Sequence, residues 1–287
     1  MMKRQGFMIL ALVALAGASG LARQGRVVDD GWCREDRGGG DRQQACEVRE
    51  FTVSAGASQV AVDATPNGGI QVFGSTRGDI VVRAKVTGQA DSQARAREIM
   101  AGVRVDAAAD KISADGPQGL DRHESWSVSY KLAVPTQTSL QLKSTNGSIS
   151  IESVEGRIDL TTVNGSVKLS RVGGEVRGRT SNGSVDVDLD GATWQGEGLD
   201  VETSNGGVKI RIPEQYSARL EAGTVNGGIS VDFPIGVQGR IDREIVTNIG
   251  AGGPAIRVHT HNGGVKVSRK LAWTPARRPD RSTLQKA

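Results

Sequence analysis

The dipeptide Asn-Gly returns along this 287-residue chain in one constant sequence setting, and it constrains the fold more than any other feature. Six copies lie within residues 139–268, at successive spacings of 18, 18, 23, 21 and 36 residues, and a seventh lies earlier. The copies are Asn67-Gly68, Asn146-Gly147, Asn164-Gly165, Asn182-Gly183, Asn205-Gly206, Asn226-Gly227 and Asn262-Gly263. The last spacing is twice the first, so the copies keep a near-constant period. A fixed period of this kind is typical of repeat architectures.

The residues around every Asn share one pattern. A β-branched residue stands three positions after each Asn, an aliphatic residue stands five positions after it, and Ser or Thr stands two positions before it. Apolar residues two apart mark one face of a β-strand. Asn-Gly readily supplies the positive φ angles of a tight turn. Each repeat is therefore predicted to form a strand, a tight turn and a second strand.

Two all-β architectures fit such a repeat. In a right-handed parallel β-solenoid, the repeats are rungs stacked about 4.8 Å apart. In the alternative, an antiparallel sheet of separate Asn-Gly hairpins, Arg179 would face Asp186 across a type I′ turn. In stacked rungs, two outward series would alternate in sign, namely Lys168, Asp186 and Lys209, and Asp188, Arg211 and Asp232. The near-constant period favours the solenoid, because stacking demands rungs of equal length.

The start of the chain indicates export. Residues 1–22 combine basic Lys3 and Arg4, an apolar run over residues 7–16 and small residues beyond it, which is the pattern of a secretory signal peptide. Lys and Arg number 36 against 32 Asp and Glu, so cleavage of the peptide would leave a net charge of only +2. That balance argues against a nucleic-acid partner. No transmembrane segment is expected after cleavage.

Cys33 and Cys46 are the only two cysteines in the sequence. In an exported chain a lone pair is expected to form a disulfide, which here would clamp residues 23–46 as an N-terminal loop. We therefore expect a protein of the bacterial periplasm or cell surface.

The rest of the chain divides by pattern. Residues 47–137 alternate in short strand-like runs, interrupted by a single helix predicted near residues 91–102. The repeat array fills residues 138–268. Residues 269–287 are basic and lack periodicity, which predicts a disordered tail in weak contact with anionic envelope surfaces.

Few residues in the array suggest chemistry. His259 and His261 should point outward from one strand, and a third metal ligand is not evident. Asp186, Asp188 and Asp190 could resemble the paired carboxylates of a glycosidase, but nearby arginines would keep them ionised. Aromatic residues that could stack on sugars are scattered near predicted turns, and they are Trp194, Tyr216 and Phe233. We therefore assign no catalytic, metal-binding or cofactor-binding residues and expect no cofactor.

The chain resembles a known family in its architectural motifs. The matching features are the alternating strand closed by Pro135, the tandem Thr-x-Asn-Gly turns, the glycine-rich residues 250–254, and the opening from Trp32 through Cys46 to Phe51. It is similar to the bacterial putative-adhesin family of unknown function, whose members carry β-strand repeats. The resemblance implies an extracytoplasmic solenoid like that of autotransporter adhesin heads, and it carries no catalytic residues.

We therefore expect a non-catalytic, adhesin-like structural or surface-contact module with an envelope, surface or glycan partner. Two alternatives stay open. One is a polysaccharide-active β-helix enzyme, and the other is an envelope protein that binds a partner protein. The small number of aromatics in the array disfavours the enzyme, because sugar sites usually present aromatic rings.

Overall fold

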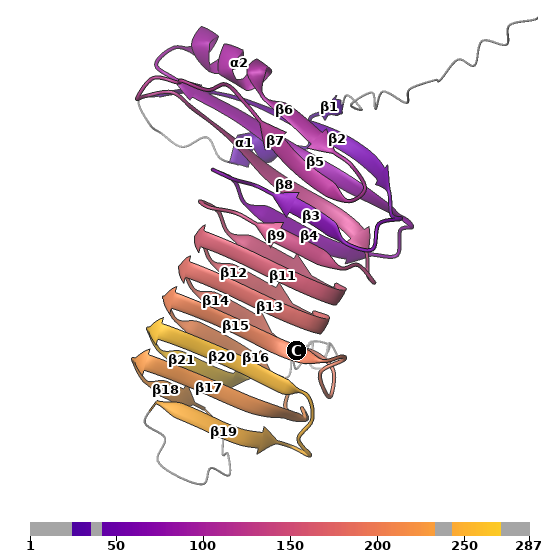
Figure 1. Cartoon of the computed structure of the whole chain (residues 1–287), viewed down its shortest axis with the longest axis vertical. Helices are drawn as coiled ribbons and strands as arrows, with labels where there is room; N and C mark the ends of the chain where they lie inside the picture. Colours follow the sequence, from indigo (N-terminus) through magenta and orange to yellow (C-terminus); the bar gives the residue numbers. More distant parts are fainter. Residues whose placement is uncertain (1–24, 36–41, 233–242, 271–287) are drawn as a thin grey trace, which may run out of the picture.

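Two long β-sheets enclose one main core in the computed structural model, which describes residues 25–35, 42–232 and 243–270 (Figure 1). Within these ranges, sheet A has eleven strands in the order β1 (Arg26–Val28), β2 (Gln43–Ser54), β5 (Asp79–Ala90), β8 (Ser125–Pro135), β4 (Ile70–Ser75), β10 (Ile149–Glu152), β12 (Val167–Ser170), β14 (Val185–Asp188), β16 (Val208–Ile212), β21 (Val265–Arg269) and β18 (Ile229–Val231). Sheet B has ten strands in the order β19 (Glu244–Ile249), β17 (Ala218–Asn226), β20 (Ala255–Asn262), β15 (Gly198–Asn205), β13 (Gly173–Asn182), β11 (Glu155–Asn164), β9 (Leu140–Lys143), β3 (Val60–Asp63), β7 (Lys111–Asp115) and β6 (Arg104–Ala107).

Each Asn-Gly dipeptide joins a strand of sheet B to a strand of sheet A and closes one rung of a stack. Neighbouring rungs pair in parallel and in register, so that Asn182 stands opposite Asn205. The predicted all-β solenoid is confirmed. The alternative of separate hairpins is wrong, because Arg179 lies beside Glu202 on the next rung, while Asp186 pairs with strands of its own sheet.

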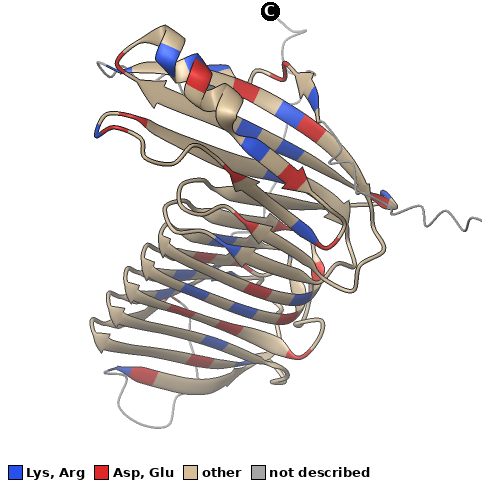
Figure 2. Ribbon diagram, turned by 45° about the horizontal axis from the view of Figure 1, so that its top comes forward, with Lys and Arg blue, Asp and Glu red and all other residues tan. Residues whose placement is uncertain are grey.

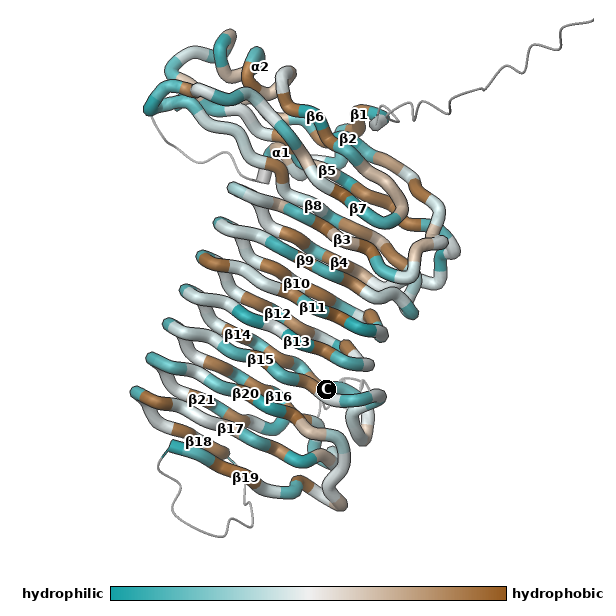
Figure 3. The backbone as a smooth tube through the Cα atoms, in the orientation of Figure 1, coloured by the Kyte–Doolittle hydropathy of each residue, from teal (hydrophilic) through white to brown (hydrophobic). Residues whose placement is uncertain are grey.

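The aliphatic pattern that defines the repeat fills the space between the sheets. Val185 and Val187 of β14 are 1% and 0% exposed, and they pair with equivalent aliphatic residues on the rungs to either side. Figure 3 shows hydrophobic and hydrophilic residues alternating along the stacked strands. The two-residue period therefore separates a sealed interior from polar outer faces.

The last repeat in the sequence does not lie last in the stack. Strands β20 and β21, which carry Asn262, insert between the rung of Asn205 and the rung of Asn226 (Figure 1). Strand β19 then pairs antiparallel with β17 and ends sheet B. The predicted outward series of Asp188, Arg211 and Asp232 is therefore wrong at its last member. Arg211 stands opposite Ser268 of the inserted rung and not beside Asp232.

The early copy at Asn67 is the first rung of the same stack. Strands β3 and β4 flank it, and they pair in parallel with β9 and β10 of the next rung. The intervening residues 76–139 form strands and a helix at this end of the stack. The stack thus includes strands from both predicted segments, residues 47–137 and the repeat array of residues 138–268.

The turn glycines are needed for a different reason from the one the sequence suggested. None of the turn asparagines has a positive φ, and neither does Gly147, Gly165 or Gly183. A Cβ atom added to Gly183 would instead overlap the carbonyl oxygen of Gly165 on the neighbouring rung. The turns therefore approach each other too closely for a side chain at this position. Only Gly68 and Gly263 among the turn glycines have a positive φ, and no turn Asn does, so the turns are not type I′.

Two sets of side-chain hydrogen bonds link the turns along the stack. Along the stack, in the order Asn67, Asn146, Asn164, Asn182, Asn205, Asn262 and Asn226, each Asn after the first donates from Nδ2 to Oδ1 of the Asn before it, over 2.7–2.9 Å. The hydroxyl two residues before each Asn of residues 139–268 donates to the carbonyl of a turn glycine on the neighbouring rung, as from Thr180 to Gly165 over 2.8 Å. Equivalent bonds start from Ser144, Thr162, Thr203, Thr224 and Thr260. On the first rung, Thr65 instead donates to Asp63 Oδ1.

The end of the stack near the N-terminus is covered by antiparallel strands and helix α2 (Gln93–Gly102). This is the helix predicted near residues 91–102. Ser92 caps it by accepting a hydrogen bond from the backbone amide of Arg95. Its residues Ala96 and Ile99 are buried against Ala45 and Ala90.

Cys33 and Cys46 form the predicted disulfide. The described part of residues 23–46 is more ordered than the predicted loop, since it contains β1 and a short helix, α1 (Trp32–Glu35). The disulfide ties α1 to β2. Trp32 is thereby held over Lys85 and Lys131, with Nζ-to-ring distances of 4.8 and 4.0 Å.

The first two residues of the predicted basic tail, Arg269 and Lys270, belong to the described fold. Arg269 closes β21, and its guanidinium donates to the Glu214 carbonyl. Lys270 Nζ lies 2.6 Å from Asp188 Oδ1. The predicted signal peptide and residues 271–287 lie outside the described residues. In the described part of the chain, neither helix has the length and apolarity needed to cross a bilayer.

Candidate functional site

The outer face of sheet B carries a ladder of alternating charge. Along one line perpendicular to the strands, consecutive rungs place an acid and then a base in register (Figure 2). The line consists of Asp159, Arg177, Asp200, Arg257 and Glu221. Opposite charges on directly adjacent strands attract one another, so this line favours the observed register.

Glu221 sits at the end of that line between two arginines. Arg219 Nε and Arg257 Nε each lie 2.8 Å from one of its carboxylate oxygens. Burial alone would raise the pKa of the Glu221 carboxyl, but the hydrogen bonds from Arg257 and Arg219 outweigh burial and lower it. The carboxylate therefore stays ionised and pairs with Arg219 on its own strand and with Arg257 on the neighbouring strand.

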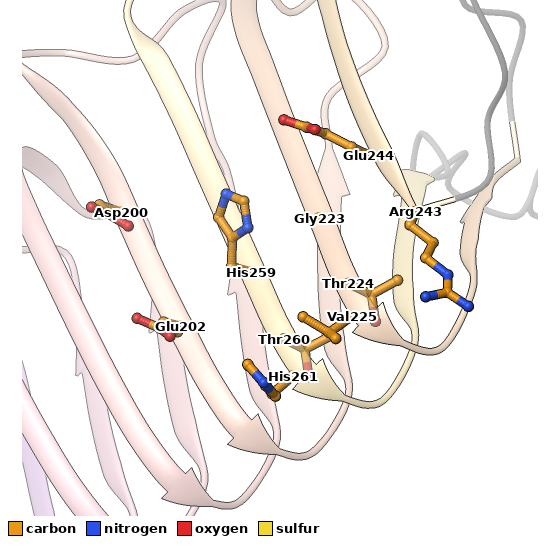
Figure 4. A pocket seen from close by; sticks show the side chains of 10 residues that line it. All are labelled: Asp200, Glu202, Gly223, Thr224, Val225, Arg243, Glu244, His259, Thr260 and His261. Carbon is orange, nitrogen blue, oxygen red and sulfur yellow. The ribbon is translucent and has the colours of Figure 1, made fainter.

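Next to this ladder the surface is hollowed. A second line in register runs from Arg179 through Glu202, His259 and Gly223 to Glu244. Because Gly223 has no side chain, a hollow of about 400 Å³ opens between β20 and β19 (Figure 4). Its lining residues are Asp200, Glu202, Gly223, Thr224, Val225, Arg243, Glu244, His259, Thr260 and His261.

Gly223 also explains how His259 is placed. A Cβ atom at residue 223 would lie 2.6 Å from His259 Nδ1, so only glycine lets the imidazole lie against β17. Both His259 and His261 are exposed, as their outward phase predicted. The hydroxyl groups of Thr224 and Thr260 are not available to donate hydrogen bonds to a ligand, because they already donate to the turn carbonyls. The hollow thus offers carboxylates and imidazoles to a polar ligand.

Among the aspartates that resembled a glycosidase pair, Asp186 and Asp188 lie on β14 of the other sheet, and Asp190 follows that strand. Asp188 is paired with Arg211, at 3.4 Å, and with Lys270. Asp190 lies 3.9 Å from Lys270. The structure therefore does not bring these carboxylates together with the histidines. In the described ranges, no group of three or more His, Cys, Asp or Glu residues has the geometry to hold a metal ion.

Two of the three aromatic residues named in the array, Trp194 and Tyr216, belong to the interior. Trp194 and Tyr216 are 3% and 2% exposed, and Phe233 lies outside the described residues. Burial, together with Asp190, raises the pKa of Tyr216 to about 12.

The hollow at Gly223 was not predicted from the sequence, because Gly223 lies beside His259 only when the rung of β20 is inserted next to β17. The one available signal was an outward glycine within a strand that is otherwise regular.

The fold and its outer faces define a parallel β-solenoid that links its rungs through turn asparagines and charge ladders. The chain belongs to the Toastrack DUF4097 family, which matches residues 45–268. No curated protein matches the chain.

Several solved structures share a low level of similarity with the chain. A putative cell adhesion protein from Clostridium sporogenes is 12% identical, with a TM-score of 0.45, over 79% of this chain and 100% of that one. A putative adhesin from Bacteroides fragilis is 11% identical, with a TM-score of 0.37, over 79% and 97%. A putative lipid binding protein from Parabacteroides distasonis is 9% identical, with a TM-score of 0.30, over 79% and 97%.

Proposed function

We propose that this protein is a non-catalytic, extracytoplasmic contact module, in which the solenoid is a rigid scaffold and its outer faces bind an envelope or surface polymer. The disulfide between Cys33 and Cys46 supports an oxidising compartment, since such bonds are rare in the reducing cytosol. The continuous hydrogen bonding of the turns supports the scaffold role.

The observation that carries the proposal is the use of the outward carboxylates. Asp188 lies between Arg211 and Lys270, and Glu221 lies between Arg219 and Arg257. A general acid must hold a proton at the working pH, whereas Arg257 and Arg219 lower the pKa of the Glu221 carboxyl and favour its ionised form. These carboxylates join neighbouring strands, which is the work of a scaffold.

A binding assay combined with a cleavage assay tests the proposal. Purified full-length chain is applied to an array of bacterial envelope glycans, and the same polymers are assayed for newly released reducing ends. We expect binding to at least one polymer without release of reducing ends.

Turnover would contradict the proposal if Asp186→Asn or Asp188→Asn abolished it while leaving the protein folded. That result would favour the polysaccharide-active enzyme. Failure to bind any polymer, together with specific binding of a purified envelope protein, would favour the partner-binding alternative.

A further inference from the structure

The outer face of sheet A carries a line of side chains that differs from the ladders of sheet B. Six consecutive rungs contribute Ser150, Lys168, Asp186, Lys209, Lys266 and Ser230, all in register. We name this line the lysine row. Its three lysines are exposed, and none makes an ion pair with the described residues.

The lysine row carries three lysines and one acid, so the row itself has an excess of positive charge. On sheet B each base of the ladder has an acid on the adjacent rung, as with Arg257 and Glu221. In the lysine row, Lys209 and Lys266 stand opposite each other on adjacent strands, and Asp186 is the only acid. Like charges directly opposite one another are unfavourable, so this arrangement does not serve the stability of the stack.

The shape of the row indicates what it fits. Adjacent rungs are about 4.8 Å apart, so the lysines lie on a straight line along the stack, with roughly 10 Å between Lys168 and Lys209. A line one residue wide matches the regularly spaced anions of a linear polymer more closely than it matches a planar membrane. Serines at both ends extend the row with hydroxyl groups that can bind sugar hydroxyls.

We propose that the lysine row is a binding site for an acidic polysaccharide, which lies along the stack with its carboxylate or sulfate groups on Lys168, Lys209 and Lys266. This inference rests on the proposed contact function and specifies its partner. The attraction is electrostatic, and binding weakens as salt rises. Asp186 limits the affinity because it repels the polyanion.

The test compares two variants of equal charge. The row variant is Lys168→Gln/Lys209→Gln/Lys266→Gln, and the control variant is Lys111→Gln/Lys143→Gln/Arg97→Gln, which removes three exposed cations elsewhere. Binding to polygalacturonate at low salt is measured by isothermal titration calorimetry, with neutral dextran as the reference. Since each basic residue near an anionic surface contributes about a fivefold gain in affinity, the row variant should lose roughly a hundredfold. The control variant should stay within about threefold of the wild type.

A gain-of-affinity variant keeps the test independent of folding defects. Asp186→Asn should bind polygalacturonate about fivefold more tightly than the wild type. Equal losses in the row and control variants would overturn the inference, and so would binding to phosphatidylglycerol vesicles without binding to the polymer. If the wild type binds only a different polymer on the glycan array, this inference fails while the proposed contact function stands. Polymer cleavage would defeat the contact function itself.

Discussion

At the scale of single residues, the turns show how stacking selects side chains. Gly183 faces the carbonyl oxygen of Gly165, and the Thr180 hydroxyl donates to that same oxygen. Asn182, beside that glycine, stays exposed, yet it is bonded to the asparagines of the rungs above and below it. Each residue of the motif is thus selected by its contact with the next rung, and its own backbone conformation matters less.

Alanine at a turn glycine should separate the rungs. Gly183→Ala would force the turns of two rungs apart, and overpacking of this kind typically costs about 1–3 kcal/mol. Gly228→Ala is the matched control, because a Cβ there meets nothing within 4 Å. Thermal melting of both variants should show a clearly lower Tm for Gly183→Ala alone. Equal Tm values would show that the turns tolerate a side chain.

Acid should weaken the charge ladder through Glu221. The pKa of this carboxyl is held below its ordinary 4.5 by Arg257 and Arg219, against the opposing effect of burial. A depressed folded-state pKa contributes stability that is present above the unfolded pKa and lost as pH falls through the folded value. The Tm should therefore drop below a pH of about 4.5, and it should drop less in Glu221→Gln. Parallel Tm curves for the two proteins from about pH 7 to pH 3 would contradict this role.

At the scale of elements, each strand pairs a sealed inner face with a charged outer face. Val187 is fully buried and packs in register with Leu169 and Ile210 of the adjacent rungs. Asp186, one residue earlier, faces outward between two lysines. Substitutions at these two neighbouring residues should therefore lower the free energy of unfolding by very different amounts.

The contrast between these two positions can be measured directly. Val187→Asp places an unpaired charge in the apolar interior and should cost several kcal/mol, enough to open the middle of the stack. Asp186→Asn should cost under about 1 kcal/mol, because surface charge pairs contribute little. Chemical denaturation of both variants gives the two free energies of unfolding. An unchanged value for Val187→Asp would show that the inner face is wrongly assigned.

The sequence predicted the elements better than their order. The two-residue period predicted that Val185 and Val187 face the interior, and the helix-forming residues around Ala96 predicted α2; the structure shows both. The position of the last rung was beyond prediction, because every rung presents the same aliphatic inner face and the same Asn. Any order of rungs satisfies those residues equally. The hollow at Gly223 could not be found either, since it exists only where β20 enters beside β17.

At the scale of the whole molecule, the chain builds one stack from repeats that are separated by other elements. Strands β5 to β8 follow the first rung in sequence and cover one end, while β19 closes sheet B at the other. Repeat proteins gain stability mainly between neighbouring rungs, so an inserted rung is held on both of its sides. The insertion also brings His259 between Glu202 and Gly223, which places the hollow on the outer face.

Disulfide trapping tests the order of the rungs most directly. Asp200 stands opposite Arg257 in the structure, whereas sequential stacking would place Asp200 beside Glu221. Paired strands lie about 4.8 Å apart, within the Cα separation of about 4.4–6.8 Å that a disulfide needs, and strands two rungs apart do not. Oxidised Asp200→Cys/Arg257→Cys should therefore form a cross-link in peptide mapping by mass spectrometry, while Asp200→Cys/Glu221→Cys should form none. A cross-link in the second variant and none in the first would contradict the inserted rung and the stack built around it.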